Sequence, residues 1–392
     1  MNPTMHRLES IDMMRGFVML LMALDHTRDY FSNALFNPLD LSQTHAAYFL
    51  TRWITHLCAP TFIFLAGAGA FLSTHRKSLT PRQLSAYLAS RGLWLIILEL
   101  TLVRFGWTFN WDYQYAIAQV IWALGWSMLA LAALVFLPRW ALAWFAVLLI
   151  AGHNAFDGIQ ADASRLSGWL WIFLHEPGTI EYLPGYSLFV PYPLVPWAGV
   201  MTAGYCLGPV FLEHNRRTIL FWLGLFCLAL FLLLRLGNLY GDPHPWTPQK
   251  GGLFSLFALI NVEKYPPSLL YLLLTLGLMF IGLAQFEGFK LQFIRQPLLI
   301  VGKVPLFFYL LHIYLIHGAA LAAAHCRGLP VDWLLMGSAD HPFPEVPAAE
   351  YGYDLWVVYG VWLVLLVLLY PFCHVFARIK ERHRQIVWLS YL

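Results

Sequence analysis

The stretch GFVMLLMALDHTRD, residues 16–29, decides the fold class of this chain. An uncharged apolar run from Gly16 to Leu24 ends in the polar sequence DHTRD. A helix that crosses the hydrocarbon core of a membrane needs about 20 mostly apolar residues, and the apolar segment that begins near Ile11 approaches that length. We therefore predict a first membrane span over 11–27, with polar residues at its outer end.

The composition of the whole chain agrees with a membrane protein. Of its 392 residues, 59% are hydrophobic and only 11% are charged, whereas soluble domains typically carry about 25% charged residues. One packed core cannot hide so much apolar surface, so lipid must cover much of it. The five cysteines are scattered without a CxxC pair, which predicts neither a disulfide framework nor a zinc site. We expect a single domain over 1–392, a lipid bilayer around it, and no nucleic-acid partner.

Hydropathy predicts an all-α bundle of ten membrane spans. A further apolar piece at 252–260 could add an eleventh element, re-entrant or interfacial. The ten predicted spans cover residues 11–27, 48–73, 84–105, 115–137, 139–155, 188–211, 218–237, 266–286, 301–324 and 355–377.

Charge distribution predicts the orientation of these spans. Lys and Arg are retained on the cytoplasmic side of membrane proteins. With the N-terminus inside, most of the 24 Lys and Arg residues fall in inner segments and most Asp and Glu residues fall outside, which places both termini in the cytoplasm. The outer loops near 28–47, 156–187, 238–265 and 325–354 are the long ones. Long loops often carry function, so we expect the chemistry at the outer face.

The polar sequence DHTRD allows two interpretations. Ionisable groups at membrane depth are costly and usually face a cavity or a partner, so Asp25 and His26 could belong to a reaction centre, where an imidazole moves a proton. Alternatively, these residues form an interfacial cap in which Arg28 pairs with Asp29.

Two further histidines lie within predicted spans. His56 lies one turn from Arg52 at the outer end of the second span, and His312 lies deep in the ninth. His317 follows His312 by five positions, a spacing that does not suit a two-histidine metal site, so we expect no metal. Lys303, near the inner end of the ninth span, could contact a phosphate or extend to the lipid headgroups.

Five stretches together resemble the heparan-α-glucosaminide N-acetyltransferase family, and in particular its bacterial branch. They cover almost the whole chain in the expected order. The stretches are RLESIDMMRGFVMLLMALDH (7–26), THLCAPTFIFLAGAG (55–69), YPLVPWAGVMTAGYCLG (192–208), KYPPSLLYLLLTLG (264–277) and GKVPLFFYLLHIYLIH (302–317).

The resemblance implies an integral protein of the bacterial inner membrane with a defined reaction. Such enzymes take acetyl-CoA from the cytosolic side and pass its acetyl group to an amino sugar on the far side. The family's asparagine at the outer end of the first span falls on His26, which is a departure from the pattern. The nearest match to its loop histidine is His45, one residue out of register, and its late-span histidine matches His312.

These observations predict a membrane acyltransferase in which a histidine assists the transfer. Histidine can act as base or acyl carrier, and basic residues at the inner side can hold CoA. Aromatic and acidic outer loops suit a sugar or glycan acceptor, to which transfer could be to oxygen or nitrogen. The predicted catalytic residues are His26, Asp25, which would orient an imidazole or the acceptor, His45, His56 and His312, and the predicted CoA-binding residues are Arg15, Arg91 and Lys303.

Other function classes fit part of the pattern. A transporter or flippase for a small polar or glycan substrate would also have broken helices and buried charges, although it would more often show an inverted repeat, and we find none. A non-catalytic membrane scaffold is the third class. The sequence leaves the acceptor and the oligomeric state open, with a homodimer among the options.

Overall fold

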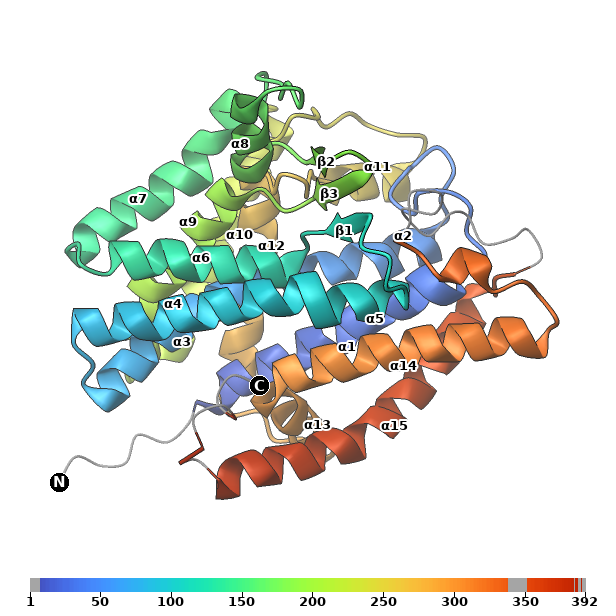
Figure 1. Ribbon diagram of the computed structural model, residues 1–392. Helices are drawn as coiled ribbons and strands as arrows, with labels where there is room; N and C mark the ends of the chain where they lie inside the picture. The colour runs from blue at the N-terminus through green and yellow to red at the C-terminus, as the bar shows by residue number, and fades with distance from the viewer. Residues whose placement is uncertain (1–7, 338–350, 384, 387–388, 390–392) are drawn as a thin grey trace.

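The computed structural model describes residues 8–337, 351–383, 385–386 and 389, and it is mainly helical (Figure 1). The helices are α1 (Glu9–Phe31), α2 (Ala46–Trp53), α3 (Cys58–Lys77), α4 (Pro81–Leu98), α5 (Arg104–Thr108), α6 (Val120–Leu134), α7 (Arg139–Gly152), α8 (Leu166–Leu174), α9 (Leu194–Leu207), α10 (Arg216–Leu236), α11 (Gly252–Ile260), α12 (Leu269–Phe286), α13 (Gln292–Lys303), α14 (Pro305–Cys326) and α15 (Leu355–Arg382).

Within the described residues, 7 helical segments are long and apolar enough to cross a membrane. They are α2 with α3, α4 with α5, α9 with the turn after it, α10, α12, α14 and α15. Helix α6 is a shorter apolar helix. The chain is therefore an integral membrane protein of the helical class, while the predicted number of ten spans stays a prediction.

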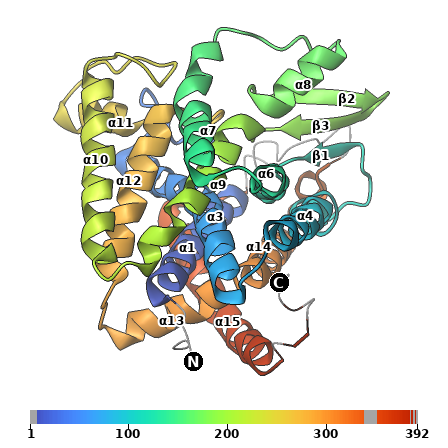
Figure 2. The same cartoon turned by 90° about the vertical axis from the view of Figure 1, so that its left-hand side faces the viewer.

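Helix α1 lies in the middle of the bundle. It packs against α3, α12, α13, α14 and α15, and Figure 2 shows it surrounded by these helices. Its burial follows from its sequence, because apolar residues occur on every side of the helix between Gly16 and Leu24. Most side chains of α1 therefore project into protein, although Glu9 and Asp29 near its two ends are exposed.

Helix α14 matches the predicted span over 301–324 apart from its start, and α13, which precedes it, was not predicted. Helix α13 ends at Lys303, Val304 leaves the helical conformation, and α14 starts at Pro305. A proline inside a helix removes a backbone donor and clashes with the preceding turn, whereas it is well suited to the first helical position. The chain therefore turns at Val304, and α13 packs along α1 instead of continuing the span.

A three-stranded sheet is the part of the fold that the all-α prediction missed. Strands β1 (Tyr115–Ile117), β2 (Gly178–Leu183) and β3 (Tyr186–Val190) are arranged in the order β1-β3-β2, with β1 parallel and β2 antiparallel to β3. The predicted spans over 115–137 and 188–211 were wrong at their starts, because α6 begins at Val120 and α9 at Leu194. Aromatic and β-branched residues before these helices favour strands.

Ion pairs and a hydrogen bond show which helix ends lie together at each end of the bundle. At one end, Glu9 on α1 pairs with Arg295 on α13, and Lys303 pairs with Glu381 on α15 at 2.6 Å. At the other end, the Asn33 amide donates to the Asp354 carboxylate at 2.8 Å. The start of α1 and the end of α15 therefore lie at one end of the bundle, here called the predicted inner end. The basic residues Arg7 and Arg384, also predicted there, lie outside the described residues.

Candidate functional site

The structure brings together His26 from α1 and His312 from α14. Their Nδ1 and Nε2 atoms are 2.7 Å apart, and the two rings are stacked with centroids 5.0 Å apart. His312 is fully buried. Two of the histidines that we predicted to be catalytic are thus in direct contact, although 286 positions separate them along the chain.

The partners of His312 determine the tautomers of the pair. His312 Nδ1 lies 2.5 Å from the carbonyl oxygen of Tyr309, and because a carbonyl only accepts, Nδ1 must carry the proton. In a neutral ring Nε2 is then an acceptor, so His26 Nδ1 donates to it. The remaining nitrogen of a neutral His26, Nε2, has a free lone pair. His26 is therefore arranged as a base whose other nitrogen is held by a second imidazole.

Aromatic side chains surround the histidine pair. The Trp107 ring meets the His26 ring edge-on at 4.7 Å, and the Tyr309 ring lies 6.3 Å from it. Tyr30 fixes this wall by donating from its hydroxyl to the Trp107 carbonyl at 2.6 Å. The Trp107 indole N–H and the Tyr309 hydroxyl are buried without a well-aligned hydrogen bond. Because the Trp107 N–H faces the Tyr309 oxygen, the Tyr309 hydroxyl proton is the donor left for a substrate near the pair.

Asp25 is held by arginines rather than by an imidazole. Arg52 donates to one carboxylate oxygen at 2.5 Å and Arg28 to the other at 3.0 Å. Arg28 also pairs with Asp29 at 2.6 Å, as the cap interpretation requires. However, the Asp25 and Arg28 side chains are only 13% and 10% exposed, so the cluster is mostly buried. Of the two predicted roles for Asp25, orienting the acceptor fits these contacts better than orienting an imidazole.

The two other predicted histidines occupy different places. His56 is buried in a short 3-10 turn between α2 and α3, where its Nδ1 lies 3.4 Å from the Arg52 carbonyl. It borders the charged cluster, since Arg52 and Asp25 act on it electrostatically. His45 is exposed at the start of α2. Among the described residues, no contact joins the His45 side chain to the histidine pair.

Lys264 is a member of this cluster that the sequence analysis did not select. It is 8% exposed and acts electrostatically on Asp25, His26 and His56. Its neighbour Tyr265 lies under the ammonium group, 4.9 Å from ring centroid to Nζ. Burial raises the pKa of Tyr265, but the cations of Lys264 and Arg52 outweigh burial and hold that pKa below its ordinary value. Both residues belong to the KYPP motif, residues 264–267, which is the sequence feature from which they could have been selected.

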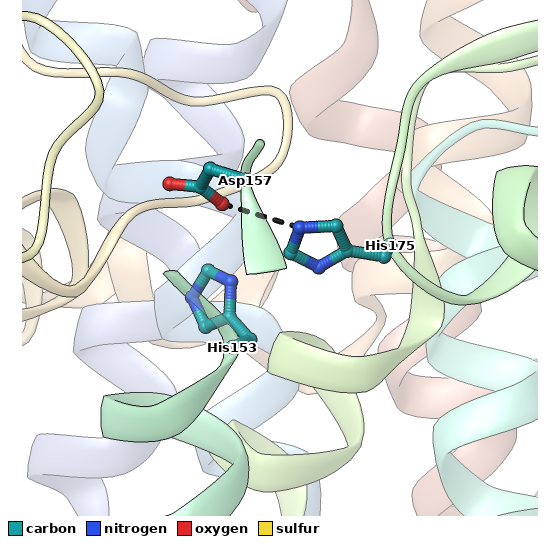
Figure 3. A group of neighbouring side chains, drawn as sticks. All are labelled: His153, Asp157 and His175. Atoms are coloured by element: carbon teal, nitrogen blue, oxygen red, sulfur yellow. Dashed lines mark ion pairs between the residues drawn. The ribbon is translucent and has the colours of Figure 1, made fainter. Parts of the chain in front are cut away.

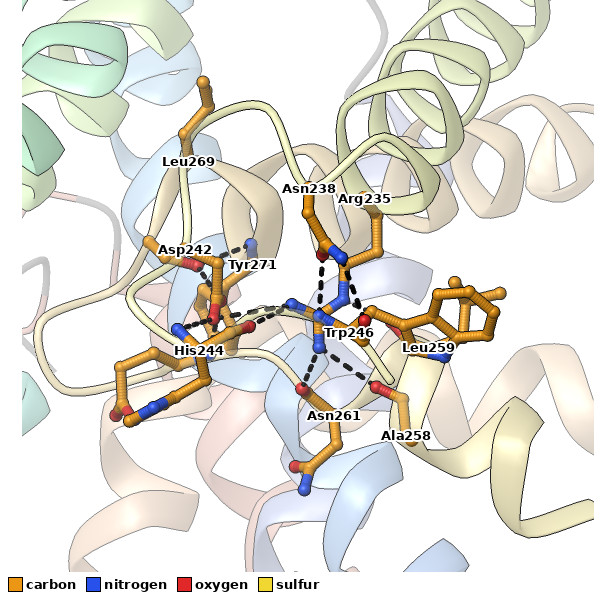
Figure 4. A network of polar contacts seen from close by, with 12 residues as sticks. Arg235, Asn238, Asp242, His244, Trp246, Ala258, Leu259, Asn261, Leu269 and Tyr271 are labelled. Carbon is orange, nitrogen blue, oxygen red and sulfur yellow. Dashed lines mark hydrogen bonds and ion pairs between the residues drawn. The ribbon is translucent and has the colours of Figure 1, made fainter. Parts of the chain in front are cut away.

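A buried polar network fixes the segment that carries Lys264 (Figure 4). The guanidinium of Arg235, at the end of α10, donates to backbone carbonyls of α11 and the adjoining loop at 2.6–3.1 Å. Asp242 accepts from the Glu263 backbone N–H at 2.8 Å and from the Ser268 hydroxyl at 2.9 Å. Because these bonds hold both flanks of Lys264, the lysine is positioned by the loop and not only by its own side chain.

Arg15, Arg91 and Lys303 line one cavity of about 320 Å³. Its walls come from α1, α3, α4, α6 and α14, and Lys380 adds a further cation. The cavity also touches Met22 and Tyr309, each about one helical turn from a member of the histidine pair. It therefore extends from basic residues near the predicted inner end to the neighbourhood of His26 and His312.

The three predicted CoA-binding residues already have partners. Arg15 donates to the Leu65 carbonyl at 2.9 Å, Lys303 pairs with Glu381, and the Arg91 guanidinium lies over the Tyr87 ring at 4.8 Å. Such contacts hold the side chains along the cavity. An anionic ligand would have to compete with Glu381 for Lys303 and with Asp12, whose carboxylate lies 3.8 Å from the Arg15 guanidinium, for Arg15.

A family model described as heparan-alpha-glucosaminide N-acetyltransferase, catalytic, matches residues 7–238. The chain belongs to this family. It is thus a membrane protein of an acetyltransferase family. A search among curated proteins found no significant match.

The match to the heparan-alpha-glucosaminide N-acetyltransferase family covers only part of the site. It includes α1, with Arg15 and His26, and α4, with Arg91. His312 and Lys264 lie beyond residue 238. The fold nevertheless brings these later residues to the end of α1, so the C-terminal helices complete the cluster that the matched region begins.

Proposed function

We propose that this member of the family is an acyltransferase of the bacterial inner membrane that uses acetyl-CoA. The donor enters from the cytoplasmic end, and the acetyl group passes to the oxygen or nitrogen of a sugar or glycan at the outer end. The observation that carries the proposal is the cavity that is lined by Arg15, Arg91 and Lys303 and reaches Met22 and Tyr309, one helical turn from His26 and His312. The predicted homodimer stays a prediction.

The cavity suits a long acyl thioester. Its basic residues would hold the CoA phosphates, because charge-assisted hydrogen bonds to phosphate are strong. Its apolar walls, such as Met19, Leu95 and Leu124, suit the pantetheine arm. A volume of about 320 Å³ is at the small end of ligand sites, which agrees with a cavity for the arm and a nucleotide kept at the rim.

His26 acts as the base in this proposal. As the acceptor's oxygen or nitrogen bonds to the acetyl carbon, His26 Nε2 takes the acceptor's proton. The thioester C–S bond breaks, and His26 returns the proton to the departing sulfur. His312 stabilises the transient imidazolium by accepting from its Nδ1–H, and one such base contributes about 10²–10⁴-fold in rate. Lys264, Arg52 and Asp25 would position the acceptor.

A transporter or flippase is the alternative function, and acetyl-CoA binding separates the two. In the enzyme, Arg91→Gln should weaken acetyl-CoA binding by about tenfold or more, because a hydrogen bond to a charged group contributes roughly 1.5–3 kcal/mol. Calorimetric titration of purified protein measures the dissociation constant. The matched control is Arg76→Gln, since Arg76 is an exposed cation at the end of α3 that does not line the cavity.

Wild type that fails to bind acetyl-CoA at millimolar concentration would refute the acyltransferase. If Arg91→Gln and Arg76→Gln weakened acetyl-CoA binding equally, acetyl-CoA would bind outside this cavity.

A further inference from the structure

His153, Asp157 and His175 form a cluster outside the candidate functional site (Figure 3). One ligand atom from each residue lies within 4.8 Å of the other two. His153 and Asp157 lie four positions apart at the C-terminal end of α7, where the 3-10 turn His153–Phe156 follows the helix. His175 immediately follows α8. Elements separated by a long loop therefore meet at these three side chains.

Among the described residues, the imidazoles of this cluster are buried with only poorly aligned polar partners. His153 and His175 are 2% and 4% exposed. Neither nitrogen of His153 has a well-aligned hydrogen bond, although the Pro267 carbonyl lies near the ring. His175 Nε2 lies 3.2 Å from Asp157 Oδ1, yet the two groups are not aligned as a hydrogen bond. Buried polar atoms left in this way are costly unless another group satisfies them.

We propose that His153, Asp157 and His175 bind a divalent transition metal ion, with Zn²⁺ as the best fit. Two imidazole nitrogens and one carboxylate oxygen are typical zinc ligands, and three protein ligands leave a fourth position for water or a substrate group. Ligand atoms on a tetrahedral zinc ion are roughly 3.3 Å apart, given bonds of about 2.0–2.1 Å. The 3.2 Å separation of His175 Nε2 from Asp157 Oδ1 already matches that value.

Neighbouring groups hold the ligands in place, as they do around metals in other proteins. The Asn154 amide donates to Asp157 Oδ2 at 2.8 Å, which leaves Oδ1 directed to the cluster. The Asn154 carbonyl oxygen in turn accepts from the Leu269 backbone N–H at 2.9 Å. The Trp171 ring packs 4.8 Å from the His175 ring. The Asp157 side chain is 22% exposed and gives the ion a path to solvent.

The ion would join three parts of the chain. It would tie the end of α7 to the end of α8, and through Asn154 and Pro267 it would brace the start of α12. This role does not depend on the proposed acyl transfer. It contradicts our sequence-based expectation of no metal, which considered only cysteine pairs and the spacing of His312 and His317.

Metal content tests the proposal directly. Untagged protein is stripped with EDTA, reloaded with equimolar ZnCl₂ at micromolar concentration, and analysed by mass spectrometry of the elements. We expect one zinc ion per chain in the wild type, loss of that ion in His153→Gln, and one ion in the matched control His214→Gln. His214 is an exposed histidine distant in sequence from the cluster.

A second variant, Asn154→Ala, keeps all three ligands. It tests the proposal even if His153→Gln fails to fold. It should weaken zinc binding by about 10–100-fold, the usual effect of removing a group that orients a ligand. Zinc should also raise the thermal midpoint of stripped wild type by mass action. Wild type that takes up no zinc, or His153→Gln that retains it, would overturn the proposal.

Discussion

At the residue scale, the direction of one hydrogen bond decides which nitrogen of His26 can take a proton. The Tyr309 carbonyl fixes the proton on His312 Nδ1, and this makes His312 Nε2 the acceptor for His26. His317, one and a half turns further along α14, is different. Both of its nitrogens lie 3.0 Å from carbonyl oxygens, those of Gly106 and Leu334. His317 has no free nitrogen for catalysis, and we assign it a structural role.

Substitutions of His312 test this tautomer argument. Glutamine places an amide oxygen near the position of Nε2, whereas phenylalanine keeps the ring and removes the acceptor. We expect His312→Phe to lower the rate of acetyl transfer by about 10²-fold or more, because it removes support for the base, with little change in acetyl-CoA binding. His312→Gln should keep more of the rate. Steady-state kinetics measure both, and equal rates in the two variants would contradict the assigned tautomers.

At the element scale, the crossing of α1 with α13 positions the inner half of the site. Gly16 on α1 lies against the Leu298 backbone, and Gly302 on α13 lies against the Asp12 backbone, so that a Cβ at either position would overlap main-chain atoms. Arg15 directly precedes Gly16, and Lys303 directly follows Gly302. The close approach of the two helices therefore sets where these two cations meet the cavity.

Gly302→Ala should disturb this crossing. Forcing a methyl group into a closed contact typically costs about 1–3 kcal/mol, so we expect a lower thermal midpoint and weaker acetyl-CoA binding. The matched control is Gly318→Ala on α14, where an added Cβ meets nothing within 4 Å. Thermal scans of both proteins in the same detergent make the comparison. A Gly302→Ala protein as stable as the control would contradict the close packing.

The elements differ in how well the sequence predicts them. Hydropathy placed the helices well where apolar runs are long, as for α10 and α15. It missed α13 and started the next span at 301, before Pro305, because a hydropathy window cannot register the break that precedes this proline. Strand β1 has only 3 residues, and its pairing with β3 is a long-range contact. Such pairing is set by tertiary packing rather than by local preference.

At the scale of the whole molecule, the start of α1 and the end of α15 lie at the same end of the bundle, and the orientation of that end in the membrane stays a prediction. Ion pairs place the start of α1 beside α13 and the end of α15 beside Lys303. The cations that line the cavity lie toward this end, whereas Arg52 and Lys264 lie with the histidines. The molecule thus has one group of cations toward the predicted inner end and another beside the histidine pair.

Reporter fusions test this orientation in cells. We expect fusions after Arg217 and after Leu392 to report the cytoplasm, because basic segments are retained there. A fusion after Thr247, in the exposed loop that follows α10, should report the outer side and serves as the control. A cytoplasmic signal at Thr247, or an outer signal at Arg217, would contradict the predicted topology.

The site shows where prediction from sequence ends. The polarity of Asp25, His26 and His312 inside apolar runs was visible, since ionisable groups at membrane depth are costly. Their contact was not predictable in detail, because it depends on how α1 crosses α14. The cluster of His153, Asp157 and His175 was missed for the same reason: its third ligand comes from another element.

The central claim is that His26 performs the chemistry of acyl transfer. Its most direct test is a single-turnover measurement with acetyl-labelled CoA and membrane vesicles, comparing wild type with His26→Ala. Alanine is preferred to asparagine, because the family resemblance places asparagine at this position. His45→Ala is the control for a histidine outside the pair. We predict that His26→Ala binds acetyl-CoA normally but transfers label at about one hundredth of the wild-type rate or less. Wild-type transfer by folded His26→Ala would contradict the account.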